Sequence, residues 1–420
     1  TFGADYTLVY KNYTLENITD DAYTYDPTVT YPDYVGTSVR EQVNQFFENS
    51  NGYVGSPDLS KKPAIDNMVT AYEANPTEEA YQEILAALNA AVVTLQEGKW
   101  YRLENTARPS YKMLVPAQRV RDNVTYAAFT GTDLNEKTAD QLWQFKKSGD
   151  NWLIYNGNYN CYISESKAMY LYAEQTDEAG AGAYDITSES TGISLLRSVN
   201  PTNSSIPYLH MAGEGNLVAW TAAESASQWY IEPVADIKAD VPEGGYATVC
   251  YPFAVIIPES VQVYAAKAVK EAAGDMAYLY ANGGFAEGTL KAGTPAVIKA
   301  EAGTQTFAIA SDIEGTADDN ALTGVLAAAS YAEGTNYVLN AAGTAFVKAA
   351  ATGTAAANTA YLPAALDVEE LPFTFTYTGI RNLNVQDGGN AAPVYDISGR
   401  RVQKAEKGIY ITSGKKQLVK

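Results

Sequence analysis

The side chains that most often carry acid–base or metal chemistry are scarce in this sequence. It contains one histidine, His210, and two cysteines in 420 residues. Histidine and cysteine supply many general bases, nucleophiles and transition-metal ligands. The sequence also shows no nucleophile elbow, zinc-binding helix, P-loop or dinucleotide fingerprint. His210 lies between apolar Leu209 and Met211 and is interpreted as a structural histidine. We therefore expect no catalytic residues, no metal ion and no cofactor.

The two cysteines are predicted to be structural. Cys161 and Cys250 each lie in an apolar, strand-like run. Unpaired cysteine behaves as a small hydrophobic residue and is often buried. The interpretation is two buried free thiols in different domains, although a disulfide between them remains open at the level of sequence.

Stacking of an aromatic ring on a sugar is the chemistry for which the sequence offers candidates. A site of this kind needs an accessible aromatic face and a few fixed polar groups. Aromatic, amide and acidic residues lie beside turn-forming residues at three places in the sequence. The same residues could instead shape the turns or pack in the core. The candidate ligand-binding residues are Asn158, Tyr159, Asn160, Asn216, Trp220, Asp133 and Asn135.

Composition narrows the classes of partner. The chain carries 49 acidic and 29 basic residues, which gives a formal net charge of −20. That charge argues against sequence-independent binding to nucleic acid, which needs a basic face, and against adsorption to an anionic membrane. No stretch approaches the apolar length that spans a bilayer. The length favours about three domains.

The N-terminal part divides into an extended segment and a helical one. Residues 1–36 are rich in Tyr, Thr and Asp and are predicted to form an extended arm. Residues 37–98 follow a helical period, which predicts a helical hairpin. Its last helix is expected from Thr77, as N-cap, to Glu97, with Gly98 as the stop.

Between residues 99 and 234 the pattern is strand throughout, and it repeats three times. Each repeat ends in an aromatic–polar–apolar triplet, and comparable strands open each repeat. A threefold all-β domain produces this pattern because one repeat alone cannot cover its own apolar face. The triplets are Trp143-Gln144-Phe145, Tyr184-Asp185-Ile186 and Trp229-Tyr230-Ile231.

These repeats resemble the ricin-type β-trefoil family. Gln141-Leu142-Trp143 matches the Q-x-W motif of that family, and Ser227-Gln228-Trp229 nearly matches it without the spacer residue. The middle repeat departs from the motif, with Ala183-Tyr184 in its place. The resemblance implies a β-trefoil, a fold that is commonly a lectin or carbohydrate-binding module. It also implies that the motif aromatic is mainly a core residue, and we do not expect all three repeats to bind sugar.

The remaining sequence predicts two further β regions. Residues 235–380 are rich in Ala, Gly and Thr, and Gly-Thr pairs separate short alternating apolar runs, which favours a β-sandwich. Residues 381–420 contain Pro393–Val402, Lys407–Ile411 and Lys415–Lys420, which read as strand, turn, strand, turn, strand. This last segment resembles the C-terminal sorting domain of proteins exported by the type IX secretion system. The resemblance implies passage across an outer membrane with the secretion machinery as partner.

The fold class that follows is mainly β and multi-domain. It comprises a short helical hairpin, a β-trefoil, a β-sandwich and a small C-terminal β module. We expect an exported protein, extracellular or on the outer-membrane surface, whose export signal was removed upstream of Thr1. The leading hypothesis is glycan binding through the trefoil. The alternatives are a structural or adhesive surface component that contacts proteins, and accessory domains of a larger secreted hydrolase.

Overall fold

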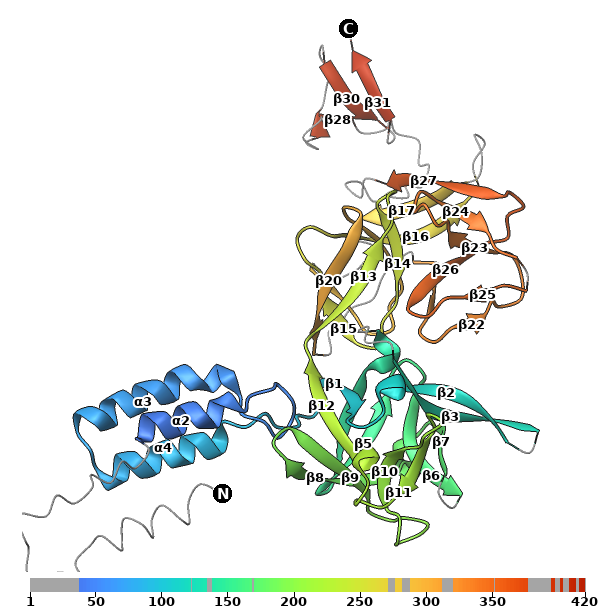
Figure 1. Cartoon of the computed structure of the whole chain (residues 1–420). Coiled ribbons are helices and arrows are strands. Elements are labelled where there is room, and N and C mark those ends of the chain that lie inside the picture. The colour runs from blue at the N-terminus through green and yellow to red at the C-terminus, as the bar shows by residue number, and fades with distance from the viewer. Residues whose placement is uncertain are drawn as a thin grey trace, which may run out of the picture. The chain divides into compact units, whose positions relative to one another are not determined.

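A computed structural model of the chain describes residues 38–376, except 122, 134–137, 168–169, 271–275, 282–287, 312–319 and 351. It also describes the strands 394–396, 401–402, 408–412 and 415–419. The chain forms two compact units, Thr1–Ile237 and Lys238–Lys420. The described part is mainly β with a short helical region near the N-terminus (Figure 1). The arm predicted over 1–36 lies outside the described residues. No helix of the described part is both long and apolar enough to cross a membrane.

The helical region predicted over residues 37–98 is a bundle of three helices. The helices are α2 (Val39–Glu48), α3 (Lys62–Ala74) and α4 (Glu78–Ala90), with the short 3-10 helix η1 (Leu59–Lys61) before α3. Thr77 is the N-cap of α4, as predicted, and its hydroxyl accepts a 3.1 Å hydrogen bond from Ala80 N–H. The apolar stripes of the three helices share one core, which consists of Val43, Phe47, Ile65, Val69, Ile84, Leu88 and Ala91.

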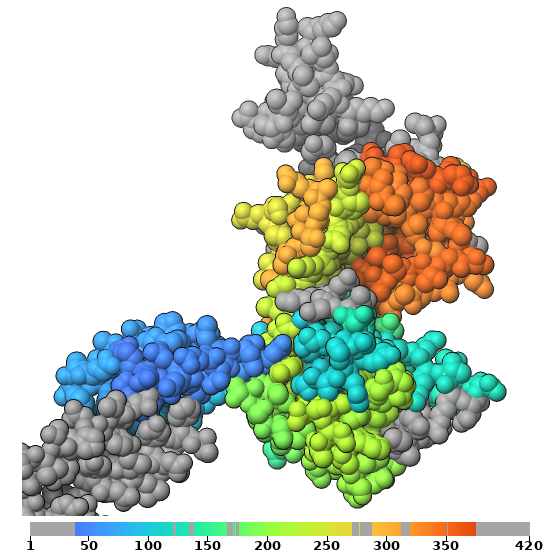
Figure 2. All heavy atoms as spheres, viewed as in Figure 1, coloured from blue at the N-terminus to red at the C-terminus, as the bar shows by residue number. Residues whose placement is uncertain are grey.

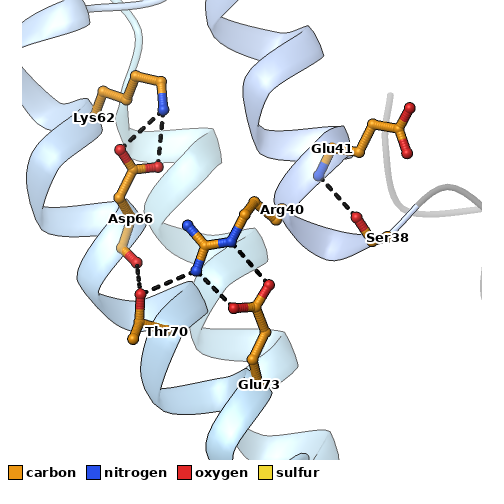
Figure 3. A network of polar contacts seen from close by, with 7 residues as sticks. All are labelled: Ser38, Arg40, Glu41, Lys62, Asp66, Thr70 and Glu73. Atoms are coloured by element: carbon orange, nitrogen blue, oxygen red, sulfur yellow. Dashed lines mark hydrogen bonds and ion pairs between the residues drawn. The ribbon is translucent and has the colours of Figure 1, made fainter.

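A polar network joins the outer faces of α2 and α3 (Figure 3). Arg40 donates to both carboxylate oxygens of Glu73, at 2.9 and 2.6 Å, and to the Thr70 hydroxyl at 3.0 Å. Lys62 donates to Asp66 on the next turn of α3 at 2.8 Å. These groups are exposed or half-exposed, so the network orients the helices more than it stabilises them.

The third helix ends seven residues before the predicted end at Glu97, at Ala90. The chain then becomes extended because residues 91–93 pair with residues 55–58. Val93 N–H donates to Ser56 O, and Gly55 N–H donates to Val93 O, both at 2.8 Å. Leu95, which fits the helical period, packs instead with Val93 against the core of the β domain that follows. Tertiary packing therefore overrides the local helical pattern.

The next 135 residues or so form a closed barrel of six strands. Its pairings run from β1 to β12, β9, β8, β5, β4 and back to β1, all antiparallel. Closure leaves no free edge among the six strands. The strands are β1 (Trp100–Asn105), β4 (Trp143–Ser148), β5 (Asn151–Asn156), β8 (Ala183–Ser190), β9 (Ile193–Ser198) and β12 (Gln228–Val234).

Three hairpins complete the domain, one in each repeat. They are β2 (Met113–Arg121) with β3 (Val124–Thr132), β6 (Cys161–Lys167) with β7 (Tyr170–Gln175), and β10 (Tyr208–Met211) with β11 (Leu217–Trp220). The hairpins pair with one another through β3–β7, β7–β11 and a bridge between Thr130 and Asn216. A six-stranded barrel with three mutually paired hairpins is a β-trefoil. The first hairpin is the longest, and its free end projects from the trefoil (Figures 1 and 2).

The triplet aromatics anchor the three repeats, as predicted for Trp143 and Trp229. Trp143, Tyr184 and Trp229 are fully buried. Each one donates a hydrogen bond to a main-chain carbonyl at the start of its own hairpin: Trp143 Nε1 to Leu114 O and Trp229 Nε1 to Leu209 O, both at 3.0 Å, and Tyr184 Oη to Ile163 O at 3.5 Å. A large buried aromatic with a polar handle needs such a partner. The repeated motif therefore encodes a repeated contact between barrel and hairpin.

The described part of the second unit is all β, in agreement with the predicted fold class. Ala265, Ala266 and Ala277 are fully buried, so the alanine-rich composition serves close packing of strands. One sheet contains β13 (Asp236–Val241), β20 (Gly303–Ala310), β15 (Ala254–Ile256) and β18 (Thr289–Leu290). The larger sheet contains β14 (Tyr246–Val249), β19 (Ala296–Lys299), β16 (Gln262–Val269), β17 (Met276–Ala281), β27 (Glu370–Thr376), β24 (Ala345–Lys348), β23 (Asn336–Leu339), β26 (Thr359–Pro363) and β21 (Thr323–Val325). A short pair, β22 (Ala329–Ser330) and β25 (Thr354–Ala355), adds to them.

The C-terminal segment forms a small antiparallel sheet. Its strands are β28 (Val394–Asp396), β29 (Arg401–Val402), β30 (Gly408–Thr412) and β31 (Lys415–Val419), in the order β29-β28-β30-β31. Strands β30 and β31 lie where strands were predicted, whereas the predicted first strand, Pro393–Val402, contains two strands, β28 and β29.

Both cysteines are free and buried, one in each unit, as predicted. Burial raises the pKa of Cys161 and of Cys250 to about 12. Thiols with such a pKa stay protonated at neutral pH and are poor nucleophiles. The described structure therefore gives neither cysteine a reactive environment.

Candidate functional site

The threefold repeat allows equivalent positions of the three hairpins to be compared directly. The acceptor carbonyls belong to Leu114, Ile163 and Leu209, so the residues just before them occupy matching positions. In the strand registers these residues pair as Met113 with Thr132, Tyr162 with Gln175, and Tyr208 with Trp220. The third hairpin is therefore the one that ends in an aromatic residue on its second strand.

The third hairpin has one face in the core and one face outward. Leu209, Met211, Leu217 and Ala219 belong to the trefoil core. Side chains alternate along a strand, so the opposite face carries Tyr208, His210, Val218 and Trp220. We call these four residues the Trp220 face. Trp220 has 38% of its surface exposed, which is unusual for so large an apolar side chain.

His210 is a buried member of the Trp220 face. It is 6% exposed, and its ring centroid lies 6.0 Å from that of Trp220. His210 Nδ1 lies 2.9 Å from the Ser227 hydroxyl, which donates in turn to Thr221 O at 2.6 Å. Burial lowers the pKa of His210 below its ordinary value, and Arg108 lowers it further. The imidazole is therefore neutral at pH 7.

Asn216 lies away from Trp220, although the sequence suggested that they act together. Asn216 immediately precedes β11, and Trp220 is the last residue of that strand. At about 3.3 Å per residue, they are about 13 Å apart along the strand. Asn216 serves the turn: its carbonyl accepts from Ala212 N–H at 2.9 Å, and its Nδ2 donates to Glu214 Oε1 at 3.4 Å. The structure does not bring Asn216 to the Trp220 face.

The candidates of the second repeat lie on the turn between β5 and β6. Asn158 is 3% exposed, whereas Tyr159 is 43% exposed. Asn160 has a positive φ of 47° and accepts a hydrogen bond from Tyr155 Oη at 3.1 Å. Tyr159 N–H donates to Asn156 Oδ1 at 3.1 Å. The amides therefore shape this turn, and Tyr159 is the residue of the group that offers a ring to solvent.

The candidates of the first repeat add little. Asp133 is exposed on the bend that follows β3. Asn135 lies outside the described residues. The bend follows Thr132, which matches Trp220 in the third hairpin. The described part of this repeat thus places no aromatic side chain at the matching position.

The sequence did not assign three residues of this region to a site: Tyr208, His210 and Ser227. A signal for the first two was present, since Tyr208 and His210 alternate with core residues in Tyr208-Leu209-His210-Met211. The pairing of Tyr208 with Trp220 depends on the length of the turn between the strands. Ser227 reaches His210 from the 3-10 helix η5 (Ser225–Ser227), a contact without a local sequence signal.

Similarity to known proteins is found among solved structures. No family model matches the chain, and no curated protein matches it. Among solved structures, a ricin B-like lectin from Macrolepiota procera in complex with lactose is similar at 16% identity and a TM-score of 0.26. The match covers 33% of this chain and 99% of the lectin. A Polyporus squamosus lectin bound to a human-type influenza-binding epitope is similar at 12% identity and a TM-score of 0.27. That match covers 34% of this chain and 52% of the lectin.

Not every similar structure is a lectin. A salivary protein from Culex quinquefasciatus, of a cysteine- and tryptophan-rich family, matches at 19% identity and a TM-score of 0.24, over 33% of this chain and 95% of that protein. All three matches cover about a third of the chain. The assignment of the β-trefoil rests on the strand pairing within this chain.

Proposed function

We propose that this chain is a glycan-binding protein whose ligand site is the Trp220 face of the trefoil. The observation that carries the proposal is the exposure of Trp220, 38%, on a hairpin whose other face is fixed in the core. An indole held in this way can stack on the C–H surface of a sugar ring without losing side-chain freedom. Tyr208, directly opposite Trp220 in the ladder, adds a second ring and a hydroxyl.

The threefold comparison supports one site per chain. Thr132 and Gln175 occupy the positions that match Trp220 in the other two hairpins. Neither residue can stack on a sugar. A single shallow site of this kind predicts weak affinity, with a Kd on the order of 0.1–1 mM, or about 4–5.5 kcal/mol. A single site does not bring the avidity that several sites would bring.

A glycan array followed by titration tests the proposal. We expect the full chain to bind at least one glycan class with a stoichiometry of one. Trp220→Ala is expected to weaken binding about tenfold or more, whereas Thr132→Ala, at the matching position, leaves it unchanged. Binding that survives in Trp220→Ala but is lost in Tyr159→Ala would move the site to the turn after β5, where Tyr159 is 43% exposed. No binding to any glycan would favour a structural or adhesive role.

We also propose that the chain acts outside the cell, on the outer-membrane surface or in the medium. The support is the likeness of residues 393–420 to type IX sorting domains. Deletion of 393–420 is expected to leave the chain in the periplasm. Cell fractionation with an antibody to the trefoil measures this. Normal amounts of the truncated chain at the surface would contradict the proposed route.

A further inference from the structure

The hydrogen bonds around His210 determine which of its ring nitrogens carries the proton. Ser227 Oγ donates its single proton to Thr221 O at 2.6 Å. The same oxygen lies 2.9 Å from His210 Nδ1, so it must accept in that contact. Nδ1 therefore carries a hydrogen, and Nε2 of the neutral ring is left with its lone pair.

The ring that carries this lone pair packs beside Trp220. Among the described residues, Ser227 is the hydrogen-bond partner of the His210 ring. The His210 side chain is buried, with 6% of its surface exposed. The Trp220 ring lies 6.0 Å from the imidazole on the same face of the hairpin.

The other hairpins do not repeat this arrangement. His210 pairs with Val218 two positions inward from the Tyr208–Trp220 pair. In the first hairpin the matching position is Val115, opposite Thr130. In the second it is Ser164, opposite Tyr172. The imidazole and the exposed indole thus occur together in the third hairpin, where the proposed site lies.

We propose that His210 is a specificity-determining residue of the Trp220 face, which accepts a hydrogen bond from a ligand hydroxyl at Nε2 while the sugar ring stacks on Trp220. The inference rests on the proposed glycan-binding function. A site of this kind selects ligands with a hydroxyl directed from the stacked ring toward the imidazole. It disfavours analogues that lack that hydroxyl. A site that offers a polar partner discriminates strongly against a ligand that leaves the partner unmatched.

The same geometry makes binding depend on pH. Protonation of His210 would place a hydrogen on Nε2 and turn the acceptor into a donor. The charged groups that act on the ring are Arg108, which disfavours protonation, and Glu214 and Glu224, which favour it. Burial is the largest influence and keeps the pKa below its ordinary value. Binding is therefore constant at neutral pH and lost on acidification.

One histidine per chain makes the tautomer directly measurable. Nitrogen NMR of the full chain labelled at histidine is expected to show one imidazole, protonated at Nδ1 and bare at Nε2, at pH 7.5. Ser227→Ala removes the acceptor for Nδ1–H and is expected to shift the population toward the Nε2–H form. A wild-type ring protonated mainly at Nε2 would overturn the inference before any ligand is added.

Titration separates this inference from the proposed function. The probes are lactose and methyl α-mannoside, together with the best glycan from the array and its single-deoxy analogues. We expect His210→Ala to weaken binding of the best probe about tenfold. His210→Gln, whose amide oxygen can reach the position of Nε2, is expected to retain binding within about threefold and to lose the pH dependence. Val115→Ala, at the matching position of the first hairpin, is the control and is expected to bind as the wild type does.

Two outcomes would count against the inference in different ways. If Trp220→Ala loses binding while His210→Ala and the wild type bind every deoxy analogue alike, His210 does not contact the ligand and the proposed function stands. If no glycan binds the wild type, the proposed function fails and the inference fails with it. Loss of affinity for one deoxy analogue in the wild type, but not in His210→Ala, would identify the hydroxyl that His210 accepts.

Discussion

The first and third hairpins of the trefoil share a core and differ on the surface. Trp143 donates to the start of the first hairpin and Trp229 to the start of the third, each at 3.0 Å. The first hairpin is long, and its exposed apolar residues, Val120 and Val124, lie near its free end. The third is short, and its exposed apolar residue, Trp220, lies beside the barrel. One scaffold thus supports two surfaces.

The difference shows how a repeated fold can specialise. Alternation along a strand assigns every second residue to the core and leaves the others free to vary. The core set stays apolar in both hairpins, with Leu114 and Phe129 in the first and Leu209 and Leu217 in the third. The outward set changes without loss of the fold. The ligand site can therefore be confined to one repeat.

The largest expected effect tests the shared core. Trp143→Ala and Trp229→Ala each remove a fully buried indole and its hydrogen bond. Each substitution is expected to cost about 3–5 kcal/mol of the free energy of unfolding. Denaturant unfolding of the full chain, followed by circular dichroism, measures the loss. A cost below about 1 kcal/mol in one of the two would show that the repeats are not equivalent.

A smaller effect is expected at the middle repeat. Tyr184→Phe keeps the buried ring but removes the hydroxyl that donates to Ile163 O at 3.5 Å. The loss of one such hydrogen bond is expected to cost about 0.5–1.5 kcal/mol. The same unfolding experiment detects it, with Tyr159→Phe on the exposed turn as the matched control. Equal stability of Tyr184→Phe and the wild type would mean that the long hydrogen bond contributes nothing.

The outward face of the third hairpin is expected to matter for binding and not for stability. Trp220→Ala removes a side chain that is 38% exposed, so the free energy of unfolding is expected to fall by about 1 kcal/mol or less. Thr132→Ala, at the matching position, provides the comparison. A loss of 3 kcal/mol or more in Trp220→Ala, on the scale of a buried aromatic, would mean that the indole is part of the core and is not poised for a ligand.

The smallest effect is the pH dependence of stability that His210 contributes. Its folded-state pKa lies below the ordinary value of about 6.5 that the unfolded chain has. The unfolded state therefore binds the proton first, so this contribution is complete above about pH 6.5 and is lost as the pH falls toward the folded-state pKa. His210→Gln is expected to lose less stability than the wild type between about pH 7.5 and pH 5. A parallel decline in both proteins would contradict the lowered pKa.

Particular residues show how far the sequence alone could go. Trp143 and Trp229 were predicted as buried anchors, because the resemblance to ricin-type repeats implies that the motif aromatic is mainly a core residue. Thr77 was predicted as a helix cap from its own neighbours and is one. These features follow from the pattern of neighbouring residues along the chain.

The end of α4 and the surroundings of Trp220 depended on residues distant in sequence. Val92 and Leu95 continue a helical period, yet hydrogen bonds of Val93 with residues 55–56 and contacts with the trefoil core make this segment extended. Asn216 and Trp220 are four residues apart, yet the strand between them separates their side chains. Ser227 contacts His210 from the 3-10 helix η5, 17 residues further along the chain.

The sequence by itself determined the strand pattern, the threefold repeat, its buried anchors and the acidic character of the chain, because each follows from residue type and spacing. The tertiary structure decided which aromatics reach solvent and which groups surround His210. Exposure and hydrogen-bond direction are properties of neighbours brought together by folding. No spacing along the chain encodes them.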